Sequence, residues 1–185
     1  NTNSFRHKNL WPSIDVVSFT KRYFGKIKNK KKFKILELGC GWGNNLRFFK
    51  DEGFNYYGIE QSKTAADYCK KRYKNIIHGD FSKINKYQNY FNCIFDRQAL
   101  QHNNKEKIKK TLFIVRNSLK KNGYFFSEIT YHKNVFTFYF NLKKIKTYFS
   151  IFSNLNISVN EVKRFNKKGI KIGKSKKIYQ VIAKK

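Results

Sequence analysis

The chain has 185 residues, which suits a single domain with a substantial core. Its formal net charge is +30 at pH 7, from 41 Lys and Arg residues against 11 Asp and Glu. No apolar run approaches the ~20 residues of a membrane span and no signal-peptide pattern opens the chain, so we expect a cytoplasmic protein.

The basic excess invites an interpretation as a nucleic-acid-binding protein, because cationic surfaces bind phosphate by releasing counterions. The excess is almost all lysine, however, and arginine, which reads bases and phosphates better, occupies only seven positions. A general bias toward lysine explains such a composition equally well. Nucleic acid therefore stays open as a partner of this chain but is not favoured.

The three cysteines, Cys40, Cys69 and Cys93, are scattered along the chain without the paired spacing of a zinc site or a disulfide framework. We interpret them as reduced, mostly buried residues. The sequence predicts no structural metal.

The first predicted element is a helix that begins after Ser13 and runs to Gly25, with apolar residues such as Val16 on one side. Together with the lysine-rich stretch that follows, this helix makes residues 1–32 an N-terminal helical cap and linker. Trp11 precedes the helix, where it either covers a ligand or packs the helix onto the body of the domain.

A strand, a glycine turn and a helix follow. Residues 35–38 form an apolar strand, and Gly39, Gly41 and Gly43 come directly after it. Glycine lets the backbone adopt positive φ and lets a ligand approach closer than a Cβ would permit. A dinucleotide fingerprint would have its third glycine at the position of Asn44, so the spacing disfavours NAD.

With Glu37 in the strand, the pattern Glu-x-Gly-x-Gly-x-Gly resembles motif I of the class I S-adenosylmethionine-dependent methyltransferases, where it wraps the methionine half of the cofactor. The resemblance implies S-adenosylmethionine as cofactor and S-adenosylhomocysteine as product. It also implies an α/β fold, a three-layer α/β/α sandwich whose mostly parallel seven-stranded sheet ends in an antiparallel β-hairpin. We expect one methyltransferase domain over residues 1–185. The alternatives are a structural glycine turn and a different nucleotide site.

The second predicted strand, residues 56–60, ends in Glu60, about 20 residues after Gly39. An acid at that distance in this fold can accept hydrogen bonds from both ribose hydroxyls of the cofactor. Gln61 follows it and is a further predicted cofactor contact. The alternative is an ordinary surface glutamate.

The third predicted strand, residues 75–81, runs into Asp80 and Phe81. In the resembled family these positions bind the adenine amino group and pack against the adenine ring. A carboxylate and an aromatic side chain suit those two roles. The fourth strand ends in Asp96, and we count Asp96 and Arg97 among the cofactor-binding residues as well.

The residues after the fourth strand distinguish between classes of methyltransferase. Enzymes that modify base amino groups in nucleic acid usually carry Asn/Asp-Pro-Pro-aromatic here, and this chain, whose single proline is Pro12, does not. Residues 96–102 instead resemble the Asp-x-x-x-Leu-x-His pattern of the small-molecule group. His102 is then the first candidate for a catalytic base, because imidazole accepts a proton near neutral pH. A packing residue at a helix start is the alternative.

A helix over residues 108–119 leads to a fifth strand, residues 124–129. Tyr131 and His132 lie just past this strand and are the second candidates for catalytic residues. The remaining predicted elements are a helix over residues 142–152 and a pair of strands over residues 156–165 and 177–183. The whole chain then makes five βα units and a terminal hairpin.

The favoured function is methyl transfer to a small-molecule acceptor. The start Trp11-Pro12-Ser13 resembles bacterial methyltransferases that make surface carbohydrate. The segment 162–177, with eight basic residues and no acid, would favour an anionic acceptor. One alternative is an RNA or protein methyltransferase that docks through the lysine surface, and another is a cofactor-binding subunit without catalysis. The sequence leaves the acceptor and the choice between O- and N-methylation open.

Overall fold

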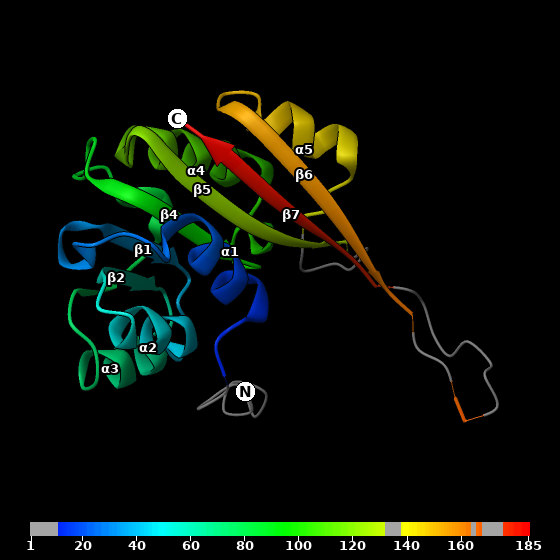
Figure 1. Cartoon of the computed structure of the whole chain (residues 1–185). Coiled ribbons are helices and arrows are strands. Elements are labelled where there is room, and N and C mark those ends of the chain that lie inside the picture. The colour runs from blue at the N-terminus through cyan, green and yellow to red at the C-terminus, as the bar shows by residue number, and fades with distance from the viewer. Residues whose placement is uncertain (1–10, 132–137, 164–165, 168–175) are drawn as a thin grey trace.

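The computed structural model describes residues 11–131, 138–163, 166–167 and 176–185. They form a seven-stranded sheet with the order β3-β2-β1-β4-β5-β7-β6, covered by helices on both faces (Figure 1). The strands are β1 (Lys34–Leu38), β2 (Asn55–Glu60), β3 (Ile76–His78), β4 (Phe91–Arg97), β5 (Leu119–Tyr131), β6 (Ser153–Val162) and β7 (Lys176–Lys184). The helices are α1 (Ile14–Phe24), α2 (Asn44–Asp51), α3 (Lys63–Lys70), α4 (Lys105–Ser118) and α5 (Leu142–Phe149), with the short 3-10 helices η2 (Lys30–Lys32), η3 (Phe81–Lys83) and η4 (Leu100–His102). The predicted three-layer sandwich is confirmed.

The strand directions decide where a ligand can bind. Strand β1 pairs in parallel with β2 and β4, β2 pairs in parallel with β3, and β4 pairs in parallel with β5. Strand β7 returns antiparallel between β5 and β6, as the predicted terminal hairpin requires. Ligand sites of open α/β sheets lie at the carboxyl ends of the parallel strands. In this chain that edge carries the glycine turn after β1, Glu60 at the end of β2 and Arg97 at the end of β4.

Two sequence-based expectations about the elements were wrong. The connection from β3 to β4 holds only η3 and no α-helix, so the chain has four βα units rather than five. The segment 79–90 is short, Asp80 caps η3, and Asn89 has a left-handed φ of 47°, which no regular helix accommodates. Strand β5 begins at Leu119 rather than at residue 124, because Leu119 already pairs with Phe91.

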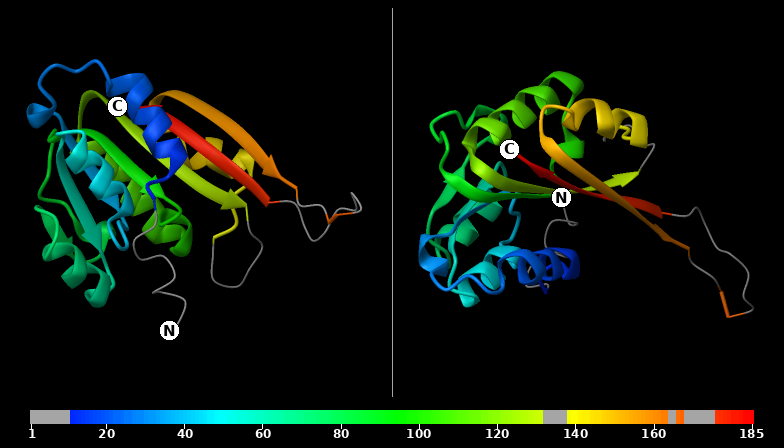
Figure 2. Two further views of the ribbon diagram at one scale, coloured as in Figure 1. Left: turned by 60° about the horizontal axis from the view of Figure 1, so that its bottom comes forward. Right: turned by 45° about the horizontal axis from the view of Figure 1, so that its top comes forward.

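The core is divided by the sheet into two clusters. One lies under α4 and α5 and includes Phe91, Phe125 and Phe149, all fully buried. The other lies under α1 and α2, where the ring of Phe19 contacts the rings of Phe95 on β4 and Phe126 on β5. Helix α1 is thus fixed against the sheet, as the two views of Figure 2 show. Among the described residues, no helix combines the length and apolar character that crossing a membrane requires.

Gly39 illustrates how tightly the end of β1 meets the loop after β4. Its φ is 62°, and a Cβ added there would lie 2.5 Å from the Cβ of Ala99. Both the backbone conformation and the close approach exclude a side chain. The loop after β4 therefore packs directly on the glycine turn.

We expect Gly39→Ala to lower the free energy of unfolding by about 1 to 3 kcal/mol, because it combines left-handed strain with a clash. Urea denaturation measures this difference. Gly79→Ala is the matched control, since Gly79 has no heavy atom within 4 Å of an added Cβ. Equal stability of the two variants would contradict the close packing of Gly39 on Ala99.

Candidate active site

The glycine turn is held in place by Glu60. Its Oε2 atom accepts a hydrogen bond of 2.9 Å from the backbone N–H of Gly41, and its Oε1 atom accepts one of 2.7 Å from the N–H of Ser62. Gly41 has a φ of 53°, and a Cβ added there would meet nothing within 4 Å. The space over Gly41 is therefore open, it lies next to the carboxylate of Glu60, and any side chain at position 41 would fill it. We call this space the cradle of Gly41.

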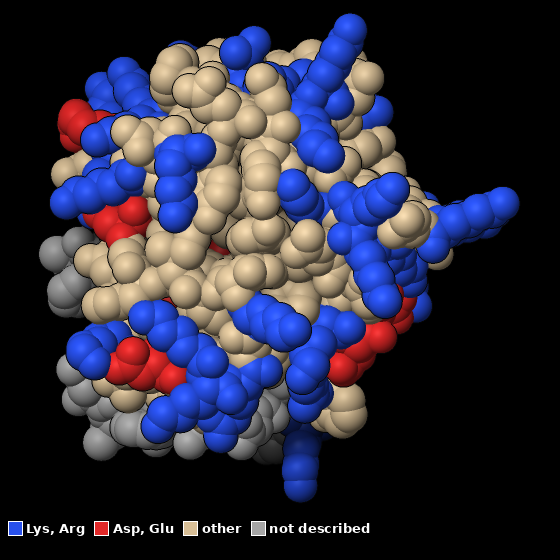
Figure 3. All heavy atoms as spheres, turned by 90° about the vertical axis from the view of Figure 1, so that its left-hand side faces the viewer, with Lys and Arg blue, Asp and Glu red and all other residues tan. Residues whose placement is uncertain are grey.

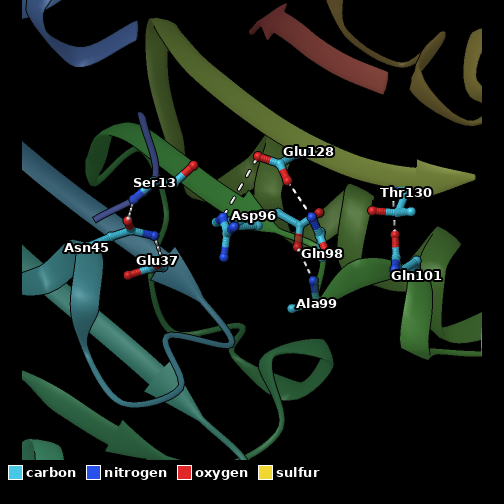
Figure 4. A network of polar contacts seen from close by, with 10 residues as sticks. Ser13, Glu37, Asn45, Asp96, Gln98, Ala99, Gln101, Glu128 and Thr130 are labelled. Atoms are coloured by element: carbon cyan, nitrogen blue, oxygen red, sulfur yellow. Dashed lines mark hydrogen bonds and ion pairs between the residues drawn. The ribbon is translucent and has the colours of Figure 1, made fainter. Parts of the chain in front are cut away.

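A hollow of about 380 Å³ lies over this turn, and we call it the Glu37 hollow. It is lined by Trp11, Ser13, Glu37, Gly39, Cys40, Gly41, Trp42, Asn44, Asn45, Glu60, Ser62, Ala65 and Arg97. Within it, Asn45 donates a 2.6 Å hydrogen bond to Oε1 of Glu37 and accepts one of 2.8 Å from the backbone N–H of Ser13 (Figure 4). Asn45 thus links helix α2 to both β1 and the start of α1.

The second carboxylate oxygen of Glu37 is buried and has no hydrogen-bond partner. Burial raises the pKa of Glu37 to about 8, and the hydrogen bond from Asn45 opposes this only in part. An unpaired buried oxygen is costly, so a native fold that keeps one is prepared for a donor from outside the chain. A cationic donor would fit this position best.

A second hollow of about 310 Å³ adjoins the first, and we call it the Phe81 hollow. Its lining is Gly39, Glu60, Gln61, Phe81, Arg97, Gln98, Ala99, His102 and Asn103. The two hollows share Gly39, Glu60 and Arg97. An elongated ligand could therefore occupy both, with its middle beside Glu60.

Most of the sequence-predicted residues come together at these hollows. The lining of the Glu37 hollow includes Glu37, Gly41 and Trp11, and that of the Phe81 hollow includes Gln61, Phe81 and His102. Both linings include Gly39, Glu60 and Arg97. Gly43, with a φ of 77°, precedes α2 and completes the turn. Trp11 is 85% exposed, with the Arg47 guanidinium 5.1 Å from its ring centroid, so it does not pack into the core.

Two predicted acids lie outside the lining of both hollows. Asp80 accepts hydrogen bonds from Lys107 Nζ at 2.6 Å and from the N–H of Ser82 at 2.9 Å. Burial opposes its ionisation, but these bonds prevail and lower its pKa to about 2. Asp96 is fully buried and bonded to the protein through both oxygens. It therefore positions the loop after β4, and no open side of it faces a ligand.

The predicted catalytic residues are only partly placed. His102 is exposed, ends η4 and lines the Phe81 hollow. Tyr131 ends β5, but its side chain is not among the described parts of the structure. His132 also lies outside the described residues, as does most of the lysine-rich segment 164–176.

Three residues of this region were not predicted, namely Asn45, Gln98 and Glu128. Asn45 contacts Glu37, and Gln98 lines the Phe81 hollow and donates to a carboxylate oxygen of Glu128. Glu128 offered only a weak signal in the sequence, as the one acid of the strand β5, and that signal did not indicate its partners. Asn45 offered none, because its role depends on a contact between helix and strand.

A larger hollow, about 820 Å³, lies elsewhere, between α4 and α5. Its lining is mainly apolar, with Leu112, Phe113, Phe138 and Ile151, and holds no acid. Its polar lining residues include four lysines, Asn141 and Thr147, but no carboxylate or histidine that could act as a catalytic acid or base. Within the described parts of the chain, no three His, Cys, Asp or Glu side chains gather as metal ligands would.

We expect Glu37→Gln to stabilise the protein, most strongly at alkaline pH. The folded-state pKa of Glu37, about 8, lies above its ordinary value of 4.5, so the folded chain holds this proton more tightly than the unfolded chain does. Stability therefore falls as the pH rises from the lower to the higher value, and the glutamine variant lacks this fall. The gain should reach on the order of a few kcal/mol above about pH 8 and vanish near about pH 4.

Urea denaturation across this pH range tests the prediction. The exposed Asp51→Asn, at the end of α2, is the control for loss of one negative charge. A stabilisation that did not change with pH would show that Glu37 is not the buried acid described above.

Residues 35–123 match the family model described as a methyltransferase domain. An uncharacterized methyltransferase of Alkaliphilus oremlandii is 30% identical over 99 residues, which cover 52% of this chain and 45% of that protein, so the match spans less than half of this relative. A SAM dependent methyltransferase from Archaeoglobus fulgidus superposes with a TM-score of 0.71 at 17% identity, over 94% of this chain and 95% of that one.

Another similar structure is the 1,6-didemethyltoxoflavin-N1-methyltransferase of Burkholderia thailandensis, with bound 1,6-didemethyltoxoflavin and S-adenosylhomocysteine. Its TM-score is 0.67 at 12% identity, over 93% of this chain and 77% of that one. The resemblance predicted from the glycine motif is thus confirmed over residues 35–123, and so is the sheet predicted with it. Residues 35–123 match a methyltransferase domain, and the chain has the seven-stranded fold of the solved methyltransferases to which it is similar.

Proposed function

We propose that this protein transfers the methyl group of S-adenosylmethionine to a small-molecule acceptor. The observation that carries the proposal is the unpaired buried oxygen of Glu37 beside the open cradle of Gly41. The methionine half of the cofactor carries an ammonium group, which would supply the missing donor and a compensating charge. The shape and the chemistry of the site therefore fit this cofactor.

The remaining cofactor contacts follow from the lining of the two hollows. Glu60, which both hollows share, would accept from the ribose hydroxyls, and Phe81 would pack against the adenine ring. Gln61 and Arg97 would border the same ligand. Asp80 has only its remaining lone pairs for the adenine amino group, since Lys107 and Ser82 already bond to it.

The cofactor, when bound, supplies an activated methyl group on a sulfonium, so the protein needs to provide orientation and a proton acceptor. His102 is our candidate base, because it borders the Phe81 hollow and is exposed to the side from which an acceptor would come. Tyr131 and His132 remain the second candidates. We infer that residues 1–185 act as one domain in which residues 1–32 are the N-terminal cap and linker.

The acceptor is proposed to be a small molecule, as 1,6-didemethyltoxoflavin is for the enzyme of Burkholderia thailandensis. An anionic or carbohydrate-like character is supported by the composition of segment 162–177, which has eight basic residues and no acid. On the face of the molecule in Figure 3, basic side chains lie in several groups with uncharged residues between them. This face therefore has no continuous basic stripe on which an RNA or a protein substrate could dock.

We expect Glu60→Ala to weaken the binding of S-adenosylhomocysteine by about 1 to 3 kcal/mol, because two ribose hydroxyls would lose their acceptor and the turn at Gly41 its anchor. Isothermal titration calorimetry measures the affinity. Asp51→Ala, which removes an exposed acid outside both hollows, should bind as the wild type does. Failure of the wild-type protein to bind millimolar cofactor would refute the proposed function.

We also expect methyl transfer to be insensitive to EDTA, because a sulfonium leaving group needs no Lewis acid. The assay follows transfer of labelled methyl groups from S-adenosylmethionine into acceptor mixtures, with and without the chelator. Loss of activity that magnesium restores would contradict this expectation.

A further inference from the structure

Next to the cofactor hollows, one row of polar side chains crosses four strands of the sheet. The strand register pairs Arg97 on β4 with Glu128 on β5, Glu128 with Gln180 on β7, and Gln180 with Ser158 on β6. Thr130 stands two residues further along β5, on the same face of the sheet. This is the face on which α1 packs, because Arg97 and Glu128 each follow by two residues a phenylalanine that contacts Phe19.

Three atoms of this row are buried and have no hydrogen-bond partner: Oε2 of Glu128, Oγ1 of Thr130 and Nε2 of Gln180. Glu128 and Thr130 are each only 2% exposed. Burying one unsatisfied polar atom is costly, and three neighbouring ones are rare in a native fold. Together they offer two hydrogen-bond acceptors and two donors, since the threonine hydroxyl can serve either way.

The carboxylate of Glu128 is held in a fixed orientation. Nε2 of Gln98 donates to its Oε1 atom, and the backbone N–H of Gln98 donates to the carbonyl oxygen of Glu128 at 2.9 Å (Figure 4). Gln98 adopts a left-handed φ of 61°, which costs a non-glycine residue about 1 kcal/mol or more. One oxygen is therefore committed to Gln98, and the other has only the ion pair with Arg97 Nε at 3.8 Å.

The position of Arg97 connects this row to the proposed cofactor site. Arg97 lines both the Glu37 hollow and the Phe81 hollow, and its side chain is 47% exposed. A change of rotamer in this exposed side chain would uncover Oε2 of Glu128. The unpaired oxygen of Glu128 is thus one side chain away from the proposed cofactor site, on the side of β5 and β7.

We propose that Glu128, Thr130 and Gln180 form the acceptor subsite of this enzyme, an inference that rests on the proposed function. The acceptor presents a neutral O–H or N–H to Oε2 of Glu128 and a hydrogen-bond acceptor atom to Nε2 of Gln180. The donor is neutral because Arg97 already supplies the positive charge that pairs with this carboxylate. A hydroxyl or amine next to an ether, hydroxyl or carbonyl oxygen has this pattern, and an anionic group elsewhere on the molecule is compatible with it.

Two small probes that differ in one donor test the subsite. Guaiacol (2-methoxyphenol) has one O–H beside one ether oxygen, and 1,2-dimethoxybenzene has the same ring with a second methoxy group in place of the O–H. Both are titrated by ligand-observed NMR against protein saturated with S-adenosylhomocysteine. We expect guaiacol to bind at millimolar concentration and 1,2-dimethoxybenzene to bind at least about tenfold more weakly, the effect of one buried hydrogen bond.

Glu128→Gln should weaken guaiacol binding by about tenfold, because the amide oxygen bonds to Gln98 and its NH2 group then meets the donor of the probe. Glu161→Gln, at an exposed position of β6, removes the same charge and should leave both affinities unchanged. Gln180→Leu, a second variant in case the first does not fold, should weaken both probes because both carry an ether oxygen.

The outcomes separate the two proposals. Calorimetry with S-adenosylhomocysteine is carried out on the wild type and on each variant. Absence of cofactor binding in the wild type refutes the proposed function and the subsite with it. The subsite alone is overturned if the cofactor binds normally and any one of three results is found. These are equal affinity for the two probes, no binding of guaiacol, and an unchanged guaiacol affinity in Glu128→Gln.

Discussion

The site depends first on the buried carboxylate of Asp96. Its Oδ1 atom accepts hydrogen bonds of 2.9 Å from the backbone N–H groups of Ala99 and Leu100, and its Oδ2 atom accepts one of 2.6 Å from the hydroxyl of Ser127. Burial raises the pKa of Asp96 to about 6 in spite of these three bonds. One side chain thereby joins β4, β5 and the loop between β4 and α4. That loop supplies Gln98, Ala99, His102 and Asn103 to the wall of the Phe81 hollow.

Three acids at this edge of the sheet illustrate how burial divides structural from functional carboxylates. Asp96 has both oxygens bonded within the protein, whereas Glu37 and Glu128 each have one bonded oxygen and one that is buried without a hydrogen bond. A fully bonded acid stabilises the loop that it caps. A half-bonded acid destabilises the protein, and under the proposed function the missing hydrogen bond would come from the ligand, so stability would be exchanged for affinity.

The features that the sequence predicted are those determined by local geometry. The glycines at positions 39, 41 and 43 adopt positive φ, and Glu60 lies at the end of its strand beside them, because such turns admit few residue types. The absence of an α-helix after β3 was not predicted, since a 3-10 turn with a side-chain cap has no periodicity to detect. Glu128 could not be assigned either, because its environment comes from Gln98 and from strand β7, which lie far away along the chain.

The double role of Asn45 has a consequence for how the N-terminal part of the chain responds to the site. A single amide group accepts from the backbone of Ser13 through its oxygen and donates to Glu37 through its nitrogen. Rotating that amide by half a turn would place a donor against the N–H of Ser13 and an acceptor against the carboxylate, so both contacts hold or fail as a pair. A ligand bound at the proposed site of Glu37 would therefore be coupled through Asn45 to the attachment of the entrance to α1, and any such coupling would be reciprocal.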